Sequence, residues 1–128
     1  MEEETEHGIR VLSMTGAFFF GTTAKMQEQI NTLVDTKVVI INCLKVPFID
    51  LSGYFALGEM VSNLHDKGVK PIIIFKNGAG MRKQMLGMGY GEILGSDGIQ
   101  DDYNVALQLA WEYLAMAREK EGKQDKEA

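Results

Sequence analysis

Residues 38–75 read VVIINCLKVPFIDLSGYFALGEMVSNLHDKGVKPIIIF and carry the clearest signals of secondary structure in the chain. Its two ends, 38–43 and 72–75, are almost wholly apolar and β-branched, which is typical of strands that are buried on both faces. Between them, apolar residues recur at the spacing of one helix face and a glycine follows as the C-cap, namely Leu57, Met60, Val61, Leu64 and then Gly68. The stretch therefore predicts a strand–helix–strand unit in which the two strands are parallel and the crossover is right-handed.

The flanking sequence adds elements on both sides of this unit. Residues 9–14 and 17–20 predict two short strands joined by a tight turn, and residues 92–94 predict a stub of another. Three further helices are predicted from their apolar faces. The first face is Met26, Ile30, Leu33 and Val34, the second is Met81, Met85 and Met88, and the third is Ala106, Leu109, Ala110, Tyr113 and Ala117. Asp101 or Asp102 caps the third helix. The fold class is α/β, a small, open, mixed but mostly parallel sheet of four to five strands with about four helices.

The chain has the apolar material for one domain. It has 128 residues, of which 45% are hydrophobic, enough for a single core. We expect residues 1–8 to be an acidic leader or linker remnant, because four of residues 2–6 are glutamate, and residues 9–117 to form the domain. Residues 118–128 predict a charged, disordered tail with no core to join.

Charge and composition exclude several classes of function. No apolar run approaches the roughly 20 residues that a membrane-spanning helix needs. The net charge is −5, and no stripe of lysine and arginine could neutralise a phosphate backbone, so nucleic acid is not an expected partner. The start is acidic, unlike a secretory signal, and the single Cys43 cannot form an internal disulfide. These features favour a cytoplasmic, reducing setting.

The residues of catalysis and metal binding are scarce. The two histidines are His7 and His65, and neither has a serine or cysteine partner in a nucleophilic arrangement. His65 fits a cation that complements a helix C-terminus, and Cys43 fits a small apolar residue of a buried strand. One cysteine and two histidines make no zinc site. We therefore expect no enzymatic activity, no metal and no cofactor.

A glycine-containing turn at residues 77–80 precedes a predicted helix. Lys76, Arg82 and Lys83 flank it and suggest a weak contact for an anion or nucleotide at the helix N-terminus. The third glycine of a dinucleotide fingerprint is missing, as is a Gly-Lys-Ser/Thr sequence. A plain turn is therefore the favoured interpretation, and nucleotide binding is not expected.

Asp50 follows a buried strand, which is also where a response-regulator receiver carries its phosphoacceptor. A receiver needs two further acids near the end of its first strand to bind magnesium, and residues 13–16 supply none. The local sequence instead predicts a helix start, in which Asp50 or Ser52 accepts a hydrogen bond from an early backbone N–H. Gly53 then permits close approach in the first turn.

Several segments of the sequence together resemble one known family. Residues 46–61, VPFIDLSGYFALGEMV, and residues 65–75, HDKGVKPIIIF, are similar to the sulfate transporter and anti-sigma-factor antagonist (STAS) domain, and the likeness extends from about Ile9 to Met116. Residues 14–21, MTGAFFFG, resemble the G-x-L-F-F-G segment that opens the cytoplasmic C-terminal STAS domains of SulP anion transporters. VPFIDLSG resembles their V-P-x-I-D-A-T/S-G, and residues 81–90, MRKQMLGMGY, their V-R-x-x-L-x-x-x-G.

The other branch of this family is the free-standing anti-sigma-factor antagonists. Their loop typically reads Asp-Ser-Ser/Thr-Gly, and a partner kinase phosphorylates the hydroxyl directly after the aspartate. This chain has Leu51 there, which cannot accept a phosphate, so the phosphorylation switch does not carry over to that position. We interpret Ser52, the next hydroxyl, as a helix cap rather than a phosphorylation site.

The resemblance implies a regulatory and protein-interaction domain of a bacterial SulP-type sulfate or anion transporter, on the cytoplasmic side of the inner (plasma) membrane. It would modulate transport through contacts with the membrane domain, a homodimer mate or a cytosolic protein. The predicted interaction loop is Asp50, Leu51, Ser52, Gly53 and Tyr54, joined by whichever of Phe19 and Phe20 faces outward. The alternative is a free-standing antagonist-like protein in a partner-switching or stress-signalling complex.

Overall fold

The computed structural model describes residues 2–6, 8–15 and 20–127, and side chains in 8–15 and 24–122. Its elements in chain order are β1 (Glu2–Glu6), β2 (Ile9–Thr15), α1 (Phe20–Asn31), β3 (Val38–Lys45), α2 (Leu51–Asp66), β4 (Lys70–Ile74), α3 (Gly78–Gly87), α4 (Gly91–Leu94), β5 (Ile99–Gln100) and α5 (Tyr103–Glu127).

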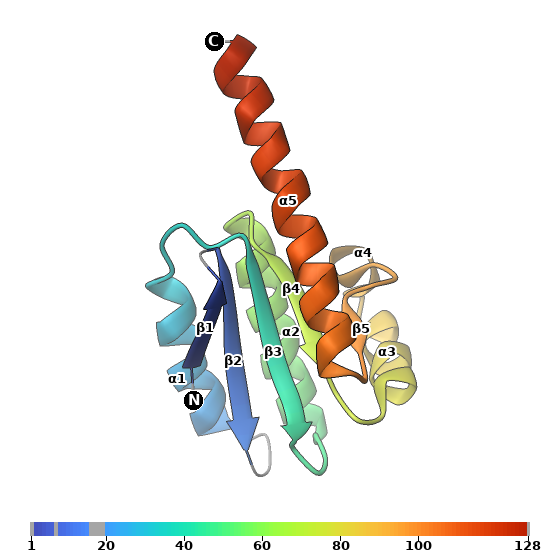
Figure 1. Cartoon of the computed structure of the whole chain (residues 1–128). Coiled ribbons are helices and arrows are strands. Elements are labelled where there is room, and N and C mark those ends of the chain that lie inside the picture. Colours follow the sequence, from blue (N-terminus) through green and yellow to red (C-terminus); the bar gives the residue numbers. More distant parts are fainter. Residues whose placement is uncertain (1, 7, 16–19, 128) are drawn as a thin grey trace.

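The strands form one open sheet in the order β1-β2-β3-β4-β5 (Figure 1). β2 to β5 are parallel, and β1 pairs antiparallel with β2. In the register, Ile40 of β3 stands opposite Val11 on one side and Ile72 on the other. The predicted α/β class and its mixed, mostly parallel sheet are confirmed.

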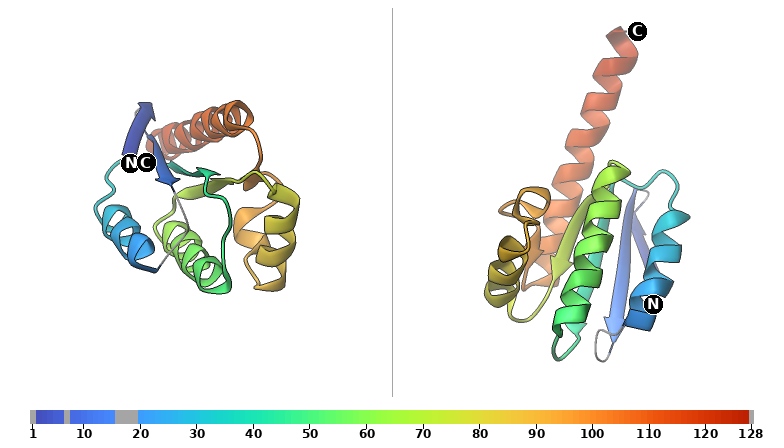
Figure 2. Two further views of the ribbon diagram at one scale, coloured as in Figure 1. Left: turned by 90° about the horizontal axis from the view of Figure 1, so that it is seen from below. Right: turned by 180° about the vertical axis from the view of Figure 1, so that it is seen from behind.

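The sheet lies between two unequal helical layers. α1 to α4 cover one face and α5 alone crosses the other, as the view from below shows (Figure 2). Because side chains alternate along a strand, β3 contributes to both cores. Val39 and Ile41 pack in the larger core with α1 to α4, while Val38 and Ile40 pack against α5.

The predicted strand–helix–strand unit is β3–α2–β4. The helix residues Leu57, Met60, Val61 and Leu64 are all 0% exposed, so the sequence identified the buried face of α2 correctly. Gly68 follows the helix with a φ of +75°, in the left-handed region that glycine enters without strain.

The first eight residues differ from the leader that the sequence suggests. Residues 2–6 form β1, an edge strand along β2 in which Glu4 is paired with Arg10. A run of glutamates has low strand propensity, but backbone pairing does not depend on side-chain polarity, and charged edge strands discourage pairing with other chains.

The region of the predicted hairpin also differs. Phe20 begins α1 instead of ending a strand, and residues 17–19 lie outside the described part of the chain. Met26 and Ile30 are buried as expected, but α1 ends at Asn31. Val34 therefore lies beyond the helix and is 73% exposed.

The predicted stub strand at residues 92–94 is wrong. These residues belong to the short helix α4, and the edge strand is β5, five residues later. A three-residue apolar run has no period that separates a strand from a helix turn, so packing decided between them.

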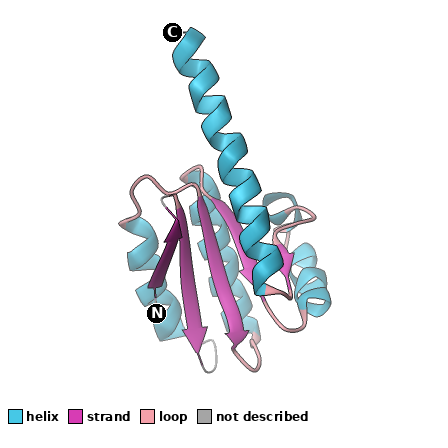
Figure 3. Cartoon of the chain, in the orientation of Figure 1, coloured by secondary structure: helices cyan, strands magenta, loops and turns pink. Residues whose placement is uncertain are grey.

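The last helix is longer than predicted. Asp102 caps it, because its Oδ1 accepts a hydrogen bond from the Val105 N–H at 3.1 Å. α5 continues through the predicted tail to Glu127 and projects beyond the sheet (Figure 3). The tail is rich in glutamate and lysine, which are good helix formers even without a core to join. Glu121 also forms an ion pair with Lys37.

Gly98, which precedes β5, lies in close contact with the end of α4. A Cβ there would overlap the Leu94 carbonyl, a backbone group that cannot move aside cheaply, and the Gly98 carbonyl also accepts the Ile73 N–H at 2.7 Å. We expect Gly98→Ala to lower the free energy of unfolding by about 2 kcal/mol, measured by urea denaturation. Gly87→Ala is the control, because its Cβ would meet nothing within 4 Å and should stabilise by up to about 1 kcal/mol. Equal effects of the two variants would contradict this packing.

Candidate functional site

The loop after β3 leads into the N-terminus of α2, at the carboxyl end of the parallel strands. Asp50 is the N-cap: its backbone is extended, with φ −82° and ψ 177°, and its Oδ1 accepts a hydrogen bond from the Gly53 N–H at 2.7 Å. The Tyr54 N–H then donates to the Asp50 carbonyl at 3.0 Å as the helix begins. Asp50 thus fixes the first turn of α2 in one geometry.

Ser52 is not the cap that the sequence allowed it to be. It is the second residue of α2 and its side chain is exposed, while the Asp50 carboxylate takes the capping bond. The physical reason is position: a capping side chain must precede the helix and keep an extended backbone, which Asp50 does.

The predicted interaction loop divides into an inward and an outward part. Gly53 is buried and Tyr54 is half-buried against the larger core. Leu51 is 61% exposed, and two aromatic residues close to it in the sequence, Phe48 and Phe55, are 58% and 55% exposed. We call Phe48, Leu51 and Phe55 the apolar patch.

Phe48 and Phe55 were missing from the predicted loop. Phe48 lies two residues before the cap, and Phe55 lies one helical turn after Leu51, so the two helix residues are neighbours on the surface. The available signal was that neither Leu51 nor Phe55 falls on the buried stripe of α2 that starts at Leu57.

Cys43 lies behind this loop and is buried. Burial raises the pKa of its thiol to about 12, and burial together with the neighbouring Cys43 raises the pKa of Tyr54. A thiol with a raised pKa stays protonated at neutral pH and is a poor nucleophile. The geometry therefore fits the structural role that the sequence predicted for Cys43.

The three cations of the predicted anion contact have different surroundings. Lys76 and Lys83 are exposed. The guanidinium of Arg82 donates to the carbonyl oxygens of Gly95, Ser96 and Ile99, at 3.0, 2.9 and 2.9 Å. These bonds join α3 to the loop before β5 and to the first residue of β5, so most of the five N–H donors of Arg82 serve the fold. The weak anion contact stays a prediction.

The described residues include neither a metal-binding cluster nor a helix that could span a membrane. They contain no group of three or more histidine, cysteine, aspartate or glutamate side chains that could hold a metal ion. Within the same ranges, no helix combines the length and hydropathy that a membrane span requires.

The family model of the STAS domain matches residues 1–85, and the chain belongs to this family. The match includes the edge strand β1, and it confirms the resemblance seen in the sequence. No curated protein sequence is similar enough to match the chain.

Solved structures of the same fold come from both branches of the family. A sulfate transporter family protein from Wolinella succinogenes has a TM-score of 0.71 at 24% identity, over 88% of this chain and 93% of that one. The SulP transporter STAS domain from Vibrio cholerae has a TM-score of 0.71 at 20% identity, over 88% of each chain. The anti-sigma factor antagonist SpoIIAA, in its unphosphorylated form, has a TM-score of 0.59 at 17% identity, over 92% of this chain and 96% of that one. At these identities the likeness establishes the fold.

The capping geometry makes a prediction about two neighbouring side chains. Asp50→Ala should lower the free energy of unfolding by about 1 kcal/mol, because it leaves the Gly53 N–H without its acceptor. Ser52→Ala, which removes an exposed hydroxyl, should change it by less than about 0.5 kcal/mol. Urea denaturation of both variants measures the difference, and a larger cost for Ser52→Ala would refute the assignment of the cap.

The buried thiol makes a second prediction. In the folded protein at pH 8, Cys43 should not react with a thiol reagent such as dithionitrobenzoate, because both access and thiolate formation are suppressed. In denaturant it should react fully. As the chain has one cysteine, the absorbance change reports that site alone, and rapid labelling of the native protein would contradict its burial.

Proposed function

We propose that this chain is the cytoplasmic regulatory and interaction domain of a bacterial SulP-type sulfate or anion transporter of the plasma membrane. Membership of the STAS family and the likeness to two transporter-derived domains support the proposal. The observation that carries it is the apolar patch beside the capped N-terminus of α2.

The patch is costly unless something covers it. Phe48, Leu51 and Phe55 each leave more than half of a large apolar side chain in water, and they lie within eight residues of the chain. Burying apolar area stabilises an interface by roughly 25 cal/mol per Å², and aromatic side chains at a rigid site are common anchors. A protein partner, either the membrane domain or a dimer mate, supplies such a surface.

The Asp50 cap makes the patch a pre-organised one. Because the first turn of α2 is already ordered, docking would not have to order it. The domain would act without a chemical step, by contacting one conformation of the transporter better than another and so shifting the population between them.

A second candidate is a free-standing antagonist-like protein in a partner-switching complex. The likeness to SpoIIAA and the exposed hydroxyl of Ser52 favour it. Leu51 argues against its usual switch, because the residue after the aspartate has no hydroxyl. The same patch would then bind a soluble partner.

The test of the transporter proposal is sulfate uptake by the parent protein. Leu51→Ser combined with Phe55→Ser should cost about 1 kcal/mol of docking and change the uptake rate about fivefold. Both side chains are exposed, so the thermal stability of the domain should hardly change. Val34→Ser is the matched control, an exposed aliphatic residue before the start of β3 and away from the patch, and it should leave uptake unchanged. Unaltered uptake in the double variant would show that the patch is not the docking surface.

A blot with an antibody against the domain decides between the two candidates. The transporter proposal expects a band several times larger than a 128-residue chain, in the membrane fraction. A soluble band of this chain's own size would reject it and favour the second candidate.

A further inference from the structure

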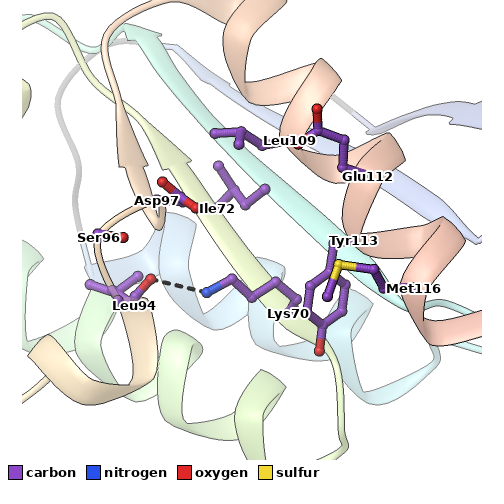
Figure 4. A pocket seen from close by; sticks show the side chains of 10 residues that line it. Lys70, Ile72, Leu94, Ser96, Asp97, Leu109, Glu112, Tyr113 and Met116 are labelled. Carbon is purple, nitrogen blue, oxygen red and sulfur yellow. Dashed lines mark hydrogen bonds between the residues drawn. The ribbon is translucent and has the colours of Figure 1, made fainter. Parts of the chain in front are cut away.

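Figure 4 shows a cavity of about 320 Å³ beside Lys70. Lys70 begins β4, so the cavity opens at the other end of the parallel strands from the apolar patch, which follows the end of β3. The cavity lies between α5, the first half of β4 and the loop from α4 to β5. The cavity exists because β5 is only two residues long and pairs with Ile73 and Ile74, which leaves the start of β4 uncovered. Its volume is in the range of small-molecule sites. Its lining residues include Lys70, Ile72, Asp97, Leu109, Glu112, Tyr113 and Met116.

A half-buried cation lies on the floor of this cavity. The Nζ of Lys70 donates a hydrogen bond to the Leu94 carbonyl at 3.0 Å. An ammonium group has three donors, so two remain for water or a ligand. Burial lowers the pKa of Lys70, while the negative charge of Asp97 acts in the opposite direction. An anionic group entering the cavity would replace hydration that the ammonium has partly lost.

Two carboxylates lie in the same cavity. Asp97 comes from the loop before β5 and Glu112 from α5, and both side chains are exposed. Lys70 forms no ion pair with either of them among the described residues, although Asp97 is close enough to affect its pKa. The cavity therefore presents separated charges of both signs.

The remaining wall is apolar. Ile72 lies on the floor and is 1% exposed, and Leu109 comes from α5. Tyr113 and Met116, also from α5, are 37% and 59% exposed, and Figure 4 shows them beside the stem of Lys70. A thioether next to an aromatic ring is a favourable surface for a further apolar group.

We propose that this cavity binds a zwitterionic α-amino acid with an apolar side chain. The ligand carboxylate binds the ammonium of Lys70, the ligand ammonium faces Asp97 or Glu112, and the side chain packs on Tyr113 and Met116. Asp97 and Glu112 repel a ligand that carries only a negative charge, and Lys70 repels one that carries only a positive charge. A zwitterion complements the charges of both signs. Multiply charged phosphates are disfavoured for the same reason. The site is independent of the proposed docking of the apolar patch, because it lies where β4 begins rather than where β3 ends.

The experiment is an NMR titration of the ¹⁵N-labelled chain with three related compounds. L-Phenylalanine carries both charges, 3-phenylpropionate lacks the ammonium, and phenethylamine lacks the carboxylate. L-Phenylalanine should shift the amide signals of residues 94–97 and 109–116 saturably. L-Phenylalanine should bind about tenfold more tightly than 3-phenylpropionate or phenethylamine. Each of these two compounds lacks one charged group, and a charge-assisted hydrogen bond contributes about tenfold or more to affinity. Equal binding of a singly charged compound, or no saturable shift with L-phenylalanine, would overturn the proposal.

Charge-removing variants locate the two contacts. Lys70→Met keeps the apolar stem and should weaken L-phenylalanine about tenfold, while leaving phenethylamine unchanged or tighter. Asp97→Asn with Glu112→Gln should weaken L-phenylalanine and leave 3-phenylpropionate unchanged or tighter. Lys67→Met, an exposed lysine after α2 that is not among the cavity's lining residues, is the control and should have no effect. The same spectra report whether each variant is folded, and unaltered binding in a folded Lys70→Met variant would refute the carboxylate contact.

Discussion

β3 is buried on both faces, and this double burial sets the positions of the neighbouring strands and helices. Its residues 38–41 are all 0% exposed, with alternate side chains in the two cores. Burial of each such side chain contributes roughly 2 kcal/mol of hydrophobic stabilisation. A one-residue shift in register would move every side chain of β3 to the opposite face, where the core has a different shape. β3 therefore fixes the register of β2 and β4, and with them the positions of the helices that follow.

The two surfaces of interest arise at opposite ends of this framework. The carboxyl end of β3 leads to Asp50, whose capping bond orders the first turn of α2 and leaves the apolar patch outside the core. At the other end, the brevity of β5 leaves the beginning of β4 open, and α5 passes over it to form the cavity around Lys70. One surface is exposed because helix geometry turns it outward, and the other because the sheet edge is incomplete.

Local sequence signals succeeded where one residue or one periodic face was sufficient. Asp50 as a cap and the buried stripe of α2 could be predicted, because capping and helical spacing depend on near neighbours. The apolar patch was only partly predicted: Leu51 was identified, while Phe48 and Phe55 needed the orientation of the loop and helix. Ser52 was misread because Asp50 and Ser52, two residues apart, are both residue types that can begin a helix, and only the backbone geometry selects between them.

Periodicity, turn residues and ordered motifs in the amino-acid sequence were enough to identify the α/β class, the central strand–helix–strand unit and the STAS family. Tertiary structure alone decided that residues 2–6 form a strand, that residues 92–94 form a helix turn and that Arg82 binds three carbonyl groups. It also brought Lys70, Asp97 and Glu112 together from three separate elements. The physical reason is that edge pairing, short apolar runs and charged side chains carry no local preference strong enough to fix their state, so long-range packing settles it.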